Sequence, residues 1–215
     1  MFATPAVATN PSDWSIGPGT NSAFKAVNRL TGKTYDDSSM ATINAVIAAA
    51  QTAYVGVRVE ENSVGNLCST KLIFDKTKAS FGAVTGTLAV GKLIYTFPPG
   101  EILVTAASMN LGLYGVANAA NTPDTGLGTT IGSGANATLN LVDSGNGENI
   151  LTGQQMNDCA GVREVITLSL DTNLVIATAG AHTVYLNTAC AWTGNTLAGA
   201  TTIDGFVVIN WTYMS

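Results

Sequence analysis

The chain has 215 residues, which suits one domain with an extension, because a single hydrophobic core serves up to about 250 residues. Charged residues make up 11% of it, under half of the ~25% typical of soluble proteins, and apolar residues make up 46%. A net charge of −5 with scattered basic residues argues against nucleic-acid binding, and no apolar run or leading segment has the pattern of a membrane span or signal peptide.

Residues 1–53 are predicted to form an extended N-terminal arm that ends in one short helix. Up to about residue 35 there is neither helical nor strand period, and turn formers such as Pro5 and Pro11 recur. From residue 39 to 53, apolar side chains recur at helical spacing, which predicts the helix. The arm also carries apolar residues that need cover from the same protein, a neighbouring subunit or another protein: Phe2, Trp14, Ile16, Phe24 and Leu30.

Residues 54–215 are predicted to be all β, because short apolar runs with a period of two alternate with Gly, Pro, Asn and Asp. The run at 202–213 is apolar on both faces, which indicates a central strand. Without interleaved long helices, the pattern favours an antiparallel β-sandwich of jelly-roll type, with the loops 117–136 and 143–161 at its ends. The runs lie at 55–59, 71–74, 81–90, 92–97, 101–105, 108–116, 137–142, 163–170, 174–177, 183–187 and 202–213.

Residues capable of catalysis are sparse. The single histidine, His182, opens a predicted strand, and no Gly-x-Ser-x-Gly elbow accompanies it, so we expect a structural role. Three cysteines lie far apart, which excludes a structural zinc site by spacing and predicts buried free thiols. They are Cys68, Cys159 and Cys190.

Loop carboxylates are the remaining candidates for chemistry. The loop from Asp143 to Glu148 is read as ordinary turn chemistry, with a calcium site or a glycosidase pair as alternatives. Two glycine-rich segments fail as phosphate loops, because Gly32-Lys-Thr lacks the required earlier glycine and residues 126–132 have the wrong spacing. We therefore expect no catalytic, cofactor-binding or metal-binding residues, and no enzyme. Further carboxylates are concentrated at Asp36, Asp37 and Asp158.

The C-terminal half carries short motifs of a known family. They are Thr-Val-Tyr-Leu-Asn at 183–187, Ala189 to Trp192 and Ile-Asp-Gly-Phe-Val-Val-Ile-Asn-Trp-Thr at 203–212, with Phe-Pro-Pro-Gly-Glu-Ile-Leu-Val at 97–104 and Leu-Gly-Leu-Tyr at 111–114. Over residues 55–215 the chain resembles the head cement or decoration proteins of tailed bacteriophages, which are auxiliary capsid proteins. The motifs are short and diffuse, with no invariant chemical residue.

The resemblance implies a jelly-roll virion protein, made in the host cytoplasm, that binds the outer surface of a phage head and stabilises contacts between major capsid subunits. Its partner is then the major capsid protein, contacted by a homo-oligomer or by symmetry-repeated copies, with no nucleic acid or membrane involved. We expect the arm or a sheet edge to contact the lattice, with Trp14, Ile16 and Phe24 as anchors. The alternative is a receptor- or carbohydrate-binding β-sandwich module of a phage tail or fibre.

Overall fold

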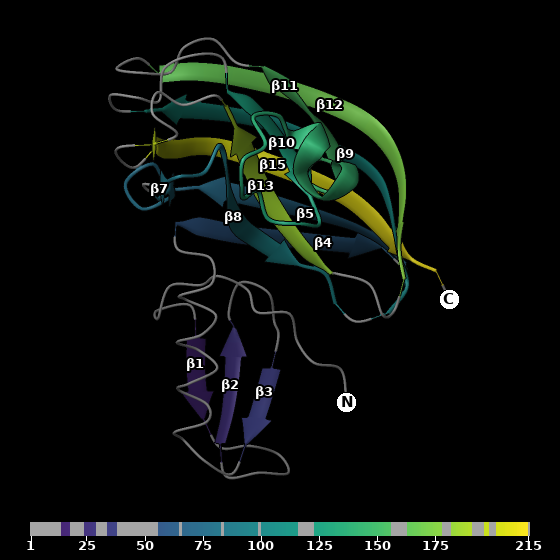
Figure 1. Cartoon of the computed structure of the whole chain (residues 1–215). Helices are drawn as coiled ribbons and strands as arrows, with labels where there is room; N and C mark the ends of the chain where they lie inside the picture. Colours follow the sequence, from purple (N-terminus) through teal and green to yellow (C-terminus); the bar gives the residue numbers. More distant parts are fainter. Residues whose placement is uncertain are drawn as a thin grey trace.

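The computed structural model is an all-β protein in which two antiparallel sheets pack face to face (Figure 1). The residues that the structure describes are 14–17, 24–28, 34–37, 56–64, 66–82, 84–98, 100–115, 123–155, 163–177, 182–190, 196–197 and 201–214. The predicted helix at 39–53 lies outside these residues. For the whole segment up to residue 55, no side chain is described.

The larger sheet has six strands and the smaller one has four. The larger sheet runs in the order β12 (Arg163–Ile176), β9 (Ile102–Tyr114), β15 (Thr201–Tyr213), β5 (Leu67–Phe74) and β4 (Val57–Val64), and β6 (Ser80–Phe81) also pairs with β15. The smaller sheet runs in the order β11 (Leu151–Gln155), β10 (Asp124–Gly128), β13 (Thr183–Ala189) and β8 (Ala89–Thr96).

The strand pairing is that of a jelly roll. Strand β5 pairs with β15, β8 with β13, β9 with β12 and β10 with β11, so the eight strands pair as one long hairpin that has been rolled up. Successive pairs of this hairpin lie alternately in the two sheets. Within each sheet, two such pairs are joined side by side, through β15 and β9 in the larger sheet and through β10 and β13 in the smaller one. The predicted jelly-roll fold is confirmed, and β4 adds an edge strand to it.

One continuous core lies between the sheets, and the two-residue period of the strands supplies it. In β15, Val207, Ile209 and Trp211 are buried, while Phe206 between the same neighbours faces outward. Strand β15 pairs with β9 on one side and β5 on the other, so its predicted central position is confirmed. The opposing sheet contributes Ile94, Leu127, Leu151, Val184 and Leu186 to the same core cluster.

Three expectations about individual elements are wrong. The predicted strand at 137–142 is replaced by the 3-10 segment η2 (Leu139–Gly145), which bends at Val142, Asp143 and Ser144. The predicted loops 117–136 and 143–161 contain strands β10 and β11. Finally, the segment without strand period contains a separate antiparallel sheet of β1 (Trp14–Gly17), β2 (Phe24–Asn28) and β3 (Thr34–Asp37). A further short pair joins β7 (Val84–Thr85) to β14 (Thr196–Leu197).

Candidate functional site

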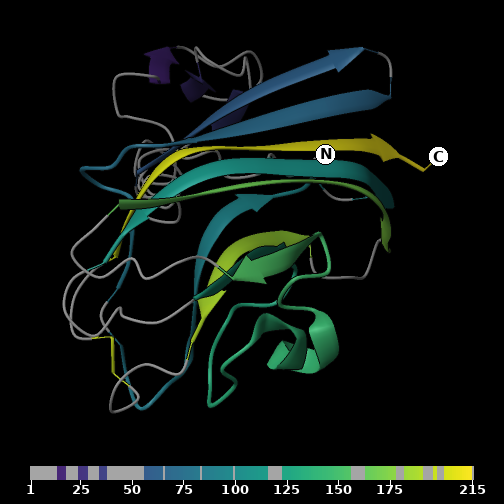
Figure 2. The ribbon, with the colours of Figure 1, turned by 90° about the horizontal axis from the view of Figure 1, so that it is seen from above.

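The two outer faces of the sandwich differ in what covers them. The outside of the four-stranded sheet carries residues 129–150, including η2 (Figure 2). Leu139 and Val142 of this segment are buried in a small cluster with Ala89 of β8 and Ala189 of β13. The chain therefore covers this face itself, with an apolar contact of its own.

The outer face of the six-stranded sheet, which we call the open face, has exposed apolar side chains. Strand register places Phe206 of β15 beside Asn110 of β9 and Ile73 of β5. The next row aligns Val208 with Ser108 and Lys71. Hydroxyl, amide and apolar groups thus alternate across the sheet. Residues that form the open face are Val165, Thr167, Ser169, Ser108, Asn110, Phe206, Val208, Ile73 and Lys71.

The described charges of the open face lie mainly on β4 and β5, and Asp204 of the central strand β15 adds one more. Arg58 of β4 forms an ion pair with Glu60 of the same strand, and the Lys71 Nζ lies 4.9 Å from the centroid of the Phe206 ring. Strand β9 contains no charged residue, and neither do the parts of β12 whose side chains are described, 165–170 and 172–176. Little charge would need to be desolvated if a partner covered the β9–β12 half.

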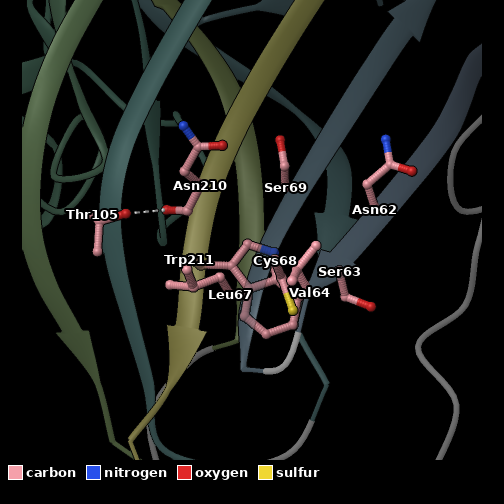
Figure 3. Close-up of a pocket in the computed structure, with 9 residues that line it drawn as sticks. All are labelled: Asn62, Ser63, Val64, Leu67, Cys68, Ser69, Thr105, Asn210 and Trp211. Atoms are coloured by element: carbon pink, nitrogen blue, oxygen red, sulfur yellow. Dashed lines mark hydrogen bonds between the residues drawn. The ribbon is translucent and has the colours of Figure 1, made fainter.

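A hollow of about 360 Å³ lies beside the tip of the β4–β5 hairpin (Figure 3). The hairpin tip beside it is apolar, with Val64 82% exposed and Leu67 67% exposed. The Thr105 hydroxyl donates to the Asn210 carbonyl oxygen at 3.2 Å and ties β9 to β15 at the rim. The residues that line the hollow are Asn62, Ser63, Val64, Leu67, Cys68, Ser69, Thr105, Asn210 and Trp211.

Aromatic side chains hold the two sheets together behind this hollow. The Trp211 indole donates to the Thr70 hydroxyl at 2.9 Å, and its ring meets Phe97 edge to face, with centroids 5.5 Å apart. Tyr95 of the opposite sheet donates its buried hydroxyl to the Glu61 carboxylate of β4. Burial, reinforced by the charge of Glu61, raises the pKa of Tyr95 well above its ordinary value. The hydroxyl therefore stays protonated and acts as a structural donor.

The hollow is suited to binding and not to acid–base chemistry. Its lining has amide and hydroxyl groups around an apolar floor, and its one ionisable side chain is the Cys68 thiol. Across the described residues, no group of three or more His, Cys, Asp or Glu side chains is placed to hold a metal ion. General acid–base catalysis needs a positioned proton donor or acceptor beside the substrate, which this lining does not supply.

The loop carboxylates singled out in the sequence serve the fold. Asp143 accepts a hydrogen bond from the Thr130 hydroxyl at 2.9 Å and one from the Asn146 amide at 3.2 Å. Glu148 accepts from the backbone N–H of Gly153 at 2.5 Å. Burial raises the pKa of Glu148, and the neighbouring charge of Asp124 raises it further, against the lowering effect of the Gly153 bond.

Asp124, which the sequence analysis did not single out, links this loop to η2. Its Oδ2 accepts from the backbone N–H of Leu139 at 2.9 Å, and a Cβ on Gly153 would lie 2.3 Å from its Oδ1. Asp124 and Glu148 thus approach the same glycine. Asp124 and Glu148 thereby connect the covering segment to β10 and β11.

The other residues singled out in the sequence lie apart from the open face. His182 is half-buried, with Nε2 2.8 Å from the Gly100 carbonyl oxygen. Cys190 is buried and Cys68 is half-buried, while Cys159 lies outside the described residues. Trp14 and Ile16 fall in β1 and Phe24 opens β2, but their side chains lie outside the described part.

The open-face residues were missed as a site, although their strands were predicted. The alternation in 202–213 already placed Phe206 and Val208 opposite the core-facing residues. What the sequence did not show is that residues 129–150 cover the other sheet, whereas no segment that the structure describes covers this one.

No protein-family model matches the chain, and no curated protein matches it significantly. Among the described residues, no helix combines the length and the apolar character needed to cross a membrane.

Proposed function

We propose that the protein is a structural virion protein that binds the outer surface of a bacteriophage head and stabilises contacts between major capsid subunits. The observation that carries this proposal is the open face, a sheet surface of hydroxyl, amide and apolar groups whose described charges, apart from Asp204, lie on β4 and β5. Such a surface loses little free energy of solvation when another protein covers it. The resemblance of residues 55–215 to head cement proteins supports the same function.

The mechanism is cementing by many weak contacts. Each copy lies across a seam between capsid subunits, and symmetry repeats the contact over the head, so expansion or rupture must break many contacts at once. The protein acts in the virion after synthesis in the host cytoplasm. It needs no cofactor and performs no catalysis.

The test uses phage heads that lack the protein. Purified protein should co-sediment with them and raise the temperature at which they rupture. Ser108→Arg, which places a long cation in the middle of the open face, should lower binding at least tenfold, because the buried cation is unpaired. Leu141→Arg is the matched control, because Leu141 is 60% exposed on η2, which covers the other sheet.

The result that overturns the proposal is equally definite. Failure of the folded wild-type protein to bind undecorated heads would refute cementing. Equal loss of binding in both variants would refute the open face as the contact surface while leaving the function in place.

A second function is favoured by the hollow beside the β4–β5 hairpin. Amide and hydroxyl groups around an apolar floor match the chemistry of a neutral sugar, which offers hydroxyls and an apolar ring face. A receptor- or carbohydrate-binding module would then bind its ligand in this hollow. Binding on a glycan array that Asn62→Ala weakens would support this function.

A further inference from the structure

The free edges of the two sheets are not equally protected. An edge strand presents unpaired backbone groups, which proteins commonly guard with charge, glycine or short length. Within the described residues, the edge strand β4 carries Arg58, Glu60 and Glu61. Edge strand β11 has five residues, including Gly153, and edge strand β8 contains Lys92. Strand β12 differs from these, because it has 14 residues and its charged positions, 163, 164 and 171, leave the stretch between them uncharged.

The middle of β12 is built as a pairing surface. Its stretch from Val165 to Leu170 reads Val-Ile-Thr-Leu-Ser-Leu and contains no charge, proline or glycine. Val165 on the outer side is 51% exposed. Leu170 alternates with the buried Ile166 on the core side, yet it remains 45% exposed. A neighbouring strand would satisfy the backbone edge and cover apolar side chains on both faces.

The partner that fits this edge is a second copy of the same strand. Two identical strands can pair antiparallel about a twofold axis. Residue i of the first copy then lies opposite residue j of the second, and residue j of the first lies opposite residue i of the second. Regular pairing of β12 with β9 runs from Arg163 to Asp171, where the register shifts. The centre of that regular stretch is Thr167.

Pairing about Thr167 gives complementary neighbours. Position 163 of one copy lies opposite position 171 of the other, and these positions hold Arg and Asp in the sequence. On the core side, Ile166 lies opposite Leu168, so apolar residues meet twice across the axis. Opposite charges directly across a strand pair stabilise it, and like charges in these positions destabilise it.

We propose that two copies of this chain pair through β12, antiparallel about a twofold axis at Thr167, and so join their six-stranded sheets into one. The dimer goes beyond the proposed function and does not depend on it. It leaves the central strands of both open faces on one continuous surface. Its test needs only the purified full-length protein.

The first experiment measures self-association by sedimentation velocity over a concentration series. The wild-type protein should dimerise, and Arg163→Asp and Asp171→Arg should each raise the dimer dissociation constant at least about tenfold by opposing like charges. The double variant restores opposite charges across the axis and should recover most of the affinity. Arg58→Asp on the opposite edge of the same sheet is the control and should leave the dissociation constant unchanged.

The second experiment determines the register. Thr167→Cys meets its own copy at the axis and should form an intermolecular disulfide under mild oxidation. Ser169→Cys, equally exposed on the same strand, lies opposite position 165 and should cross-link at least tenfold more slowly. The wild-type protein treated with the same oxidant is the control for cross-linking through the native cysteines.

Three results of the sedimentation experiment would overturn the proposal. These are a wild-type protein that stays monomeric at every concentration, a dimer insensitive to both charge reversals, and a double variant no tighter than the single ones. Circular dichroism of each variant shows whether it is folded. Faster cross-linking at Ser169 than at Thr167 would refute the register on which the proposal stands.

Discussion

Asn187 fastens the covering segment to the four-stranded sheet, and it is fully buried. Its Oδ1 accepts from the Gly132 N–H at 2.7 Å, and its Nδ2 donates to the carbonyl oxygens of Thr130 at 2.9 Å and Gly147 at 2.7 Å. Asn187→Ala leaves these three groups without partners in the interior, and we expect a loss of about 3–5 kcal/mol in the free energy of unfolding. Urea denaturation measures this loss.

The control for Asn187 is a second asparagine on a strand. Asn210 is exposed on β15, and Asn210→Ala should change the free energy of unfolding by less than about 0.5 kcal/mol. Similar losses in the two variants would show that the buried hydrogen bonds of Asn187 contribute no more than an exposed amide.

Glu148 predicts a dependence of stability on pH. Its pKa is raised in the folded state, first by burial and then by Asp124, so the folded protein binds this proton more tightly than the unfolded chain does. The stability from this group is therefore fully present below the ordinary pKa of 4.5 and is lost as the pH rises through the folded pKa. Glu148→Gln keeps an oxygen that can accept from Gly153 and removes the charge.

The expected result is a variant that gains on the wild type as the pH rises. Between pH 4 and pH 7 the stability difference should shift in favour of Glu148→Gln by no more than about 1 kcal/mol, because the side chain is partly solvated. Urea denaturation of both proteins at the two pH values measures the shift. A difference that stays constant with pH would contradict the raised pKa.

At the scale of elements, strands with strong apolar alternation were predictable and glycine-rich ones were not. Strand β10 has two glycines in five residues, so it lacks the pattern by which β15 was recognised. The glycines are required by close approach: a Cβ on Gly128 would lie 2.3 Å from the Asn146 carbonyl oxygen, and one on Gly126 would lie 2.8 Å from that of Leu151. This packing is visible only in the folded chain.

The segment η2 failed as a prediction for a different physical reason. Its alternating Leu139 and Leu141 fit a strand period, yet Leu139 packs on the sheet while Leu141 is exposed on the covering segment. The hydrogen bond from the Leu139 N–H to Asp124, 15 residues away in the chain, positions the first turn. A local periodicity cannot report a partner at that separation.

At the scale of the molecule, the sequence was sufficient to predict the jelly roll but not to locate the open face. Strand number and turn spacing favoured the rolled hairpin, because sequential short strands without long helices leave few other packings. The open face depends on which sheet the chain covers itself, and this follows from Leu139 and Val142 contacting Ala89 and Ala189. Those contacts join segments far apart in the sequence.

The strand pairing predicts that residues 54–215 fold without the N-terminal segment. All pairs of the two large sheets lie between Val57 and Tyr213, while β1, β2 and β3 pair only with one another. The fragment also keeps the Gly56 carbonyl oxygen, which accepts from the Asp75 N–H at 2.8 Å. We expect one cooperative urea transition and an unchanged near-ultraviolet circular dichroism spectrum, apart from the loss of the aromatic residues of the removed segment.

Head binding by that fragment separates the two contact surfaces. If Trp14, Ile16 and Phe24 anchor the protein, the fragment should bind undecorated heads more weakly than the full chain, yet it should remain sensitive to Ser108→Arg through the open face. Triple replacement of the three anchors by alanine in the full chain should weaken binding to the same extent. A folded fragment that binds as tightly as the full chain would show that the sandwich alone makes the contact, whereas a fragment without a cooperative transition would show that the N-terminal segment completes the core.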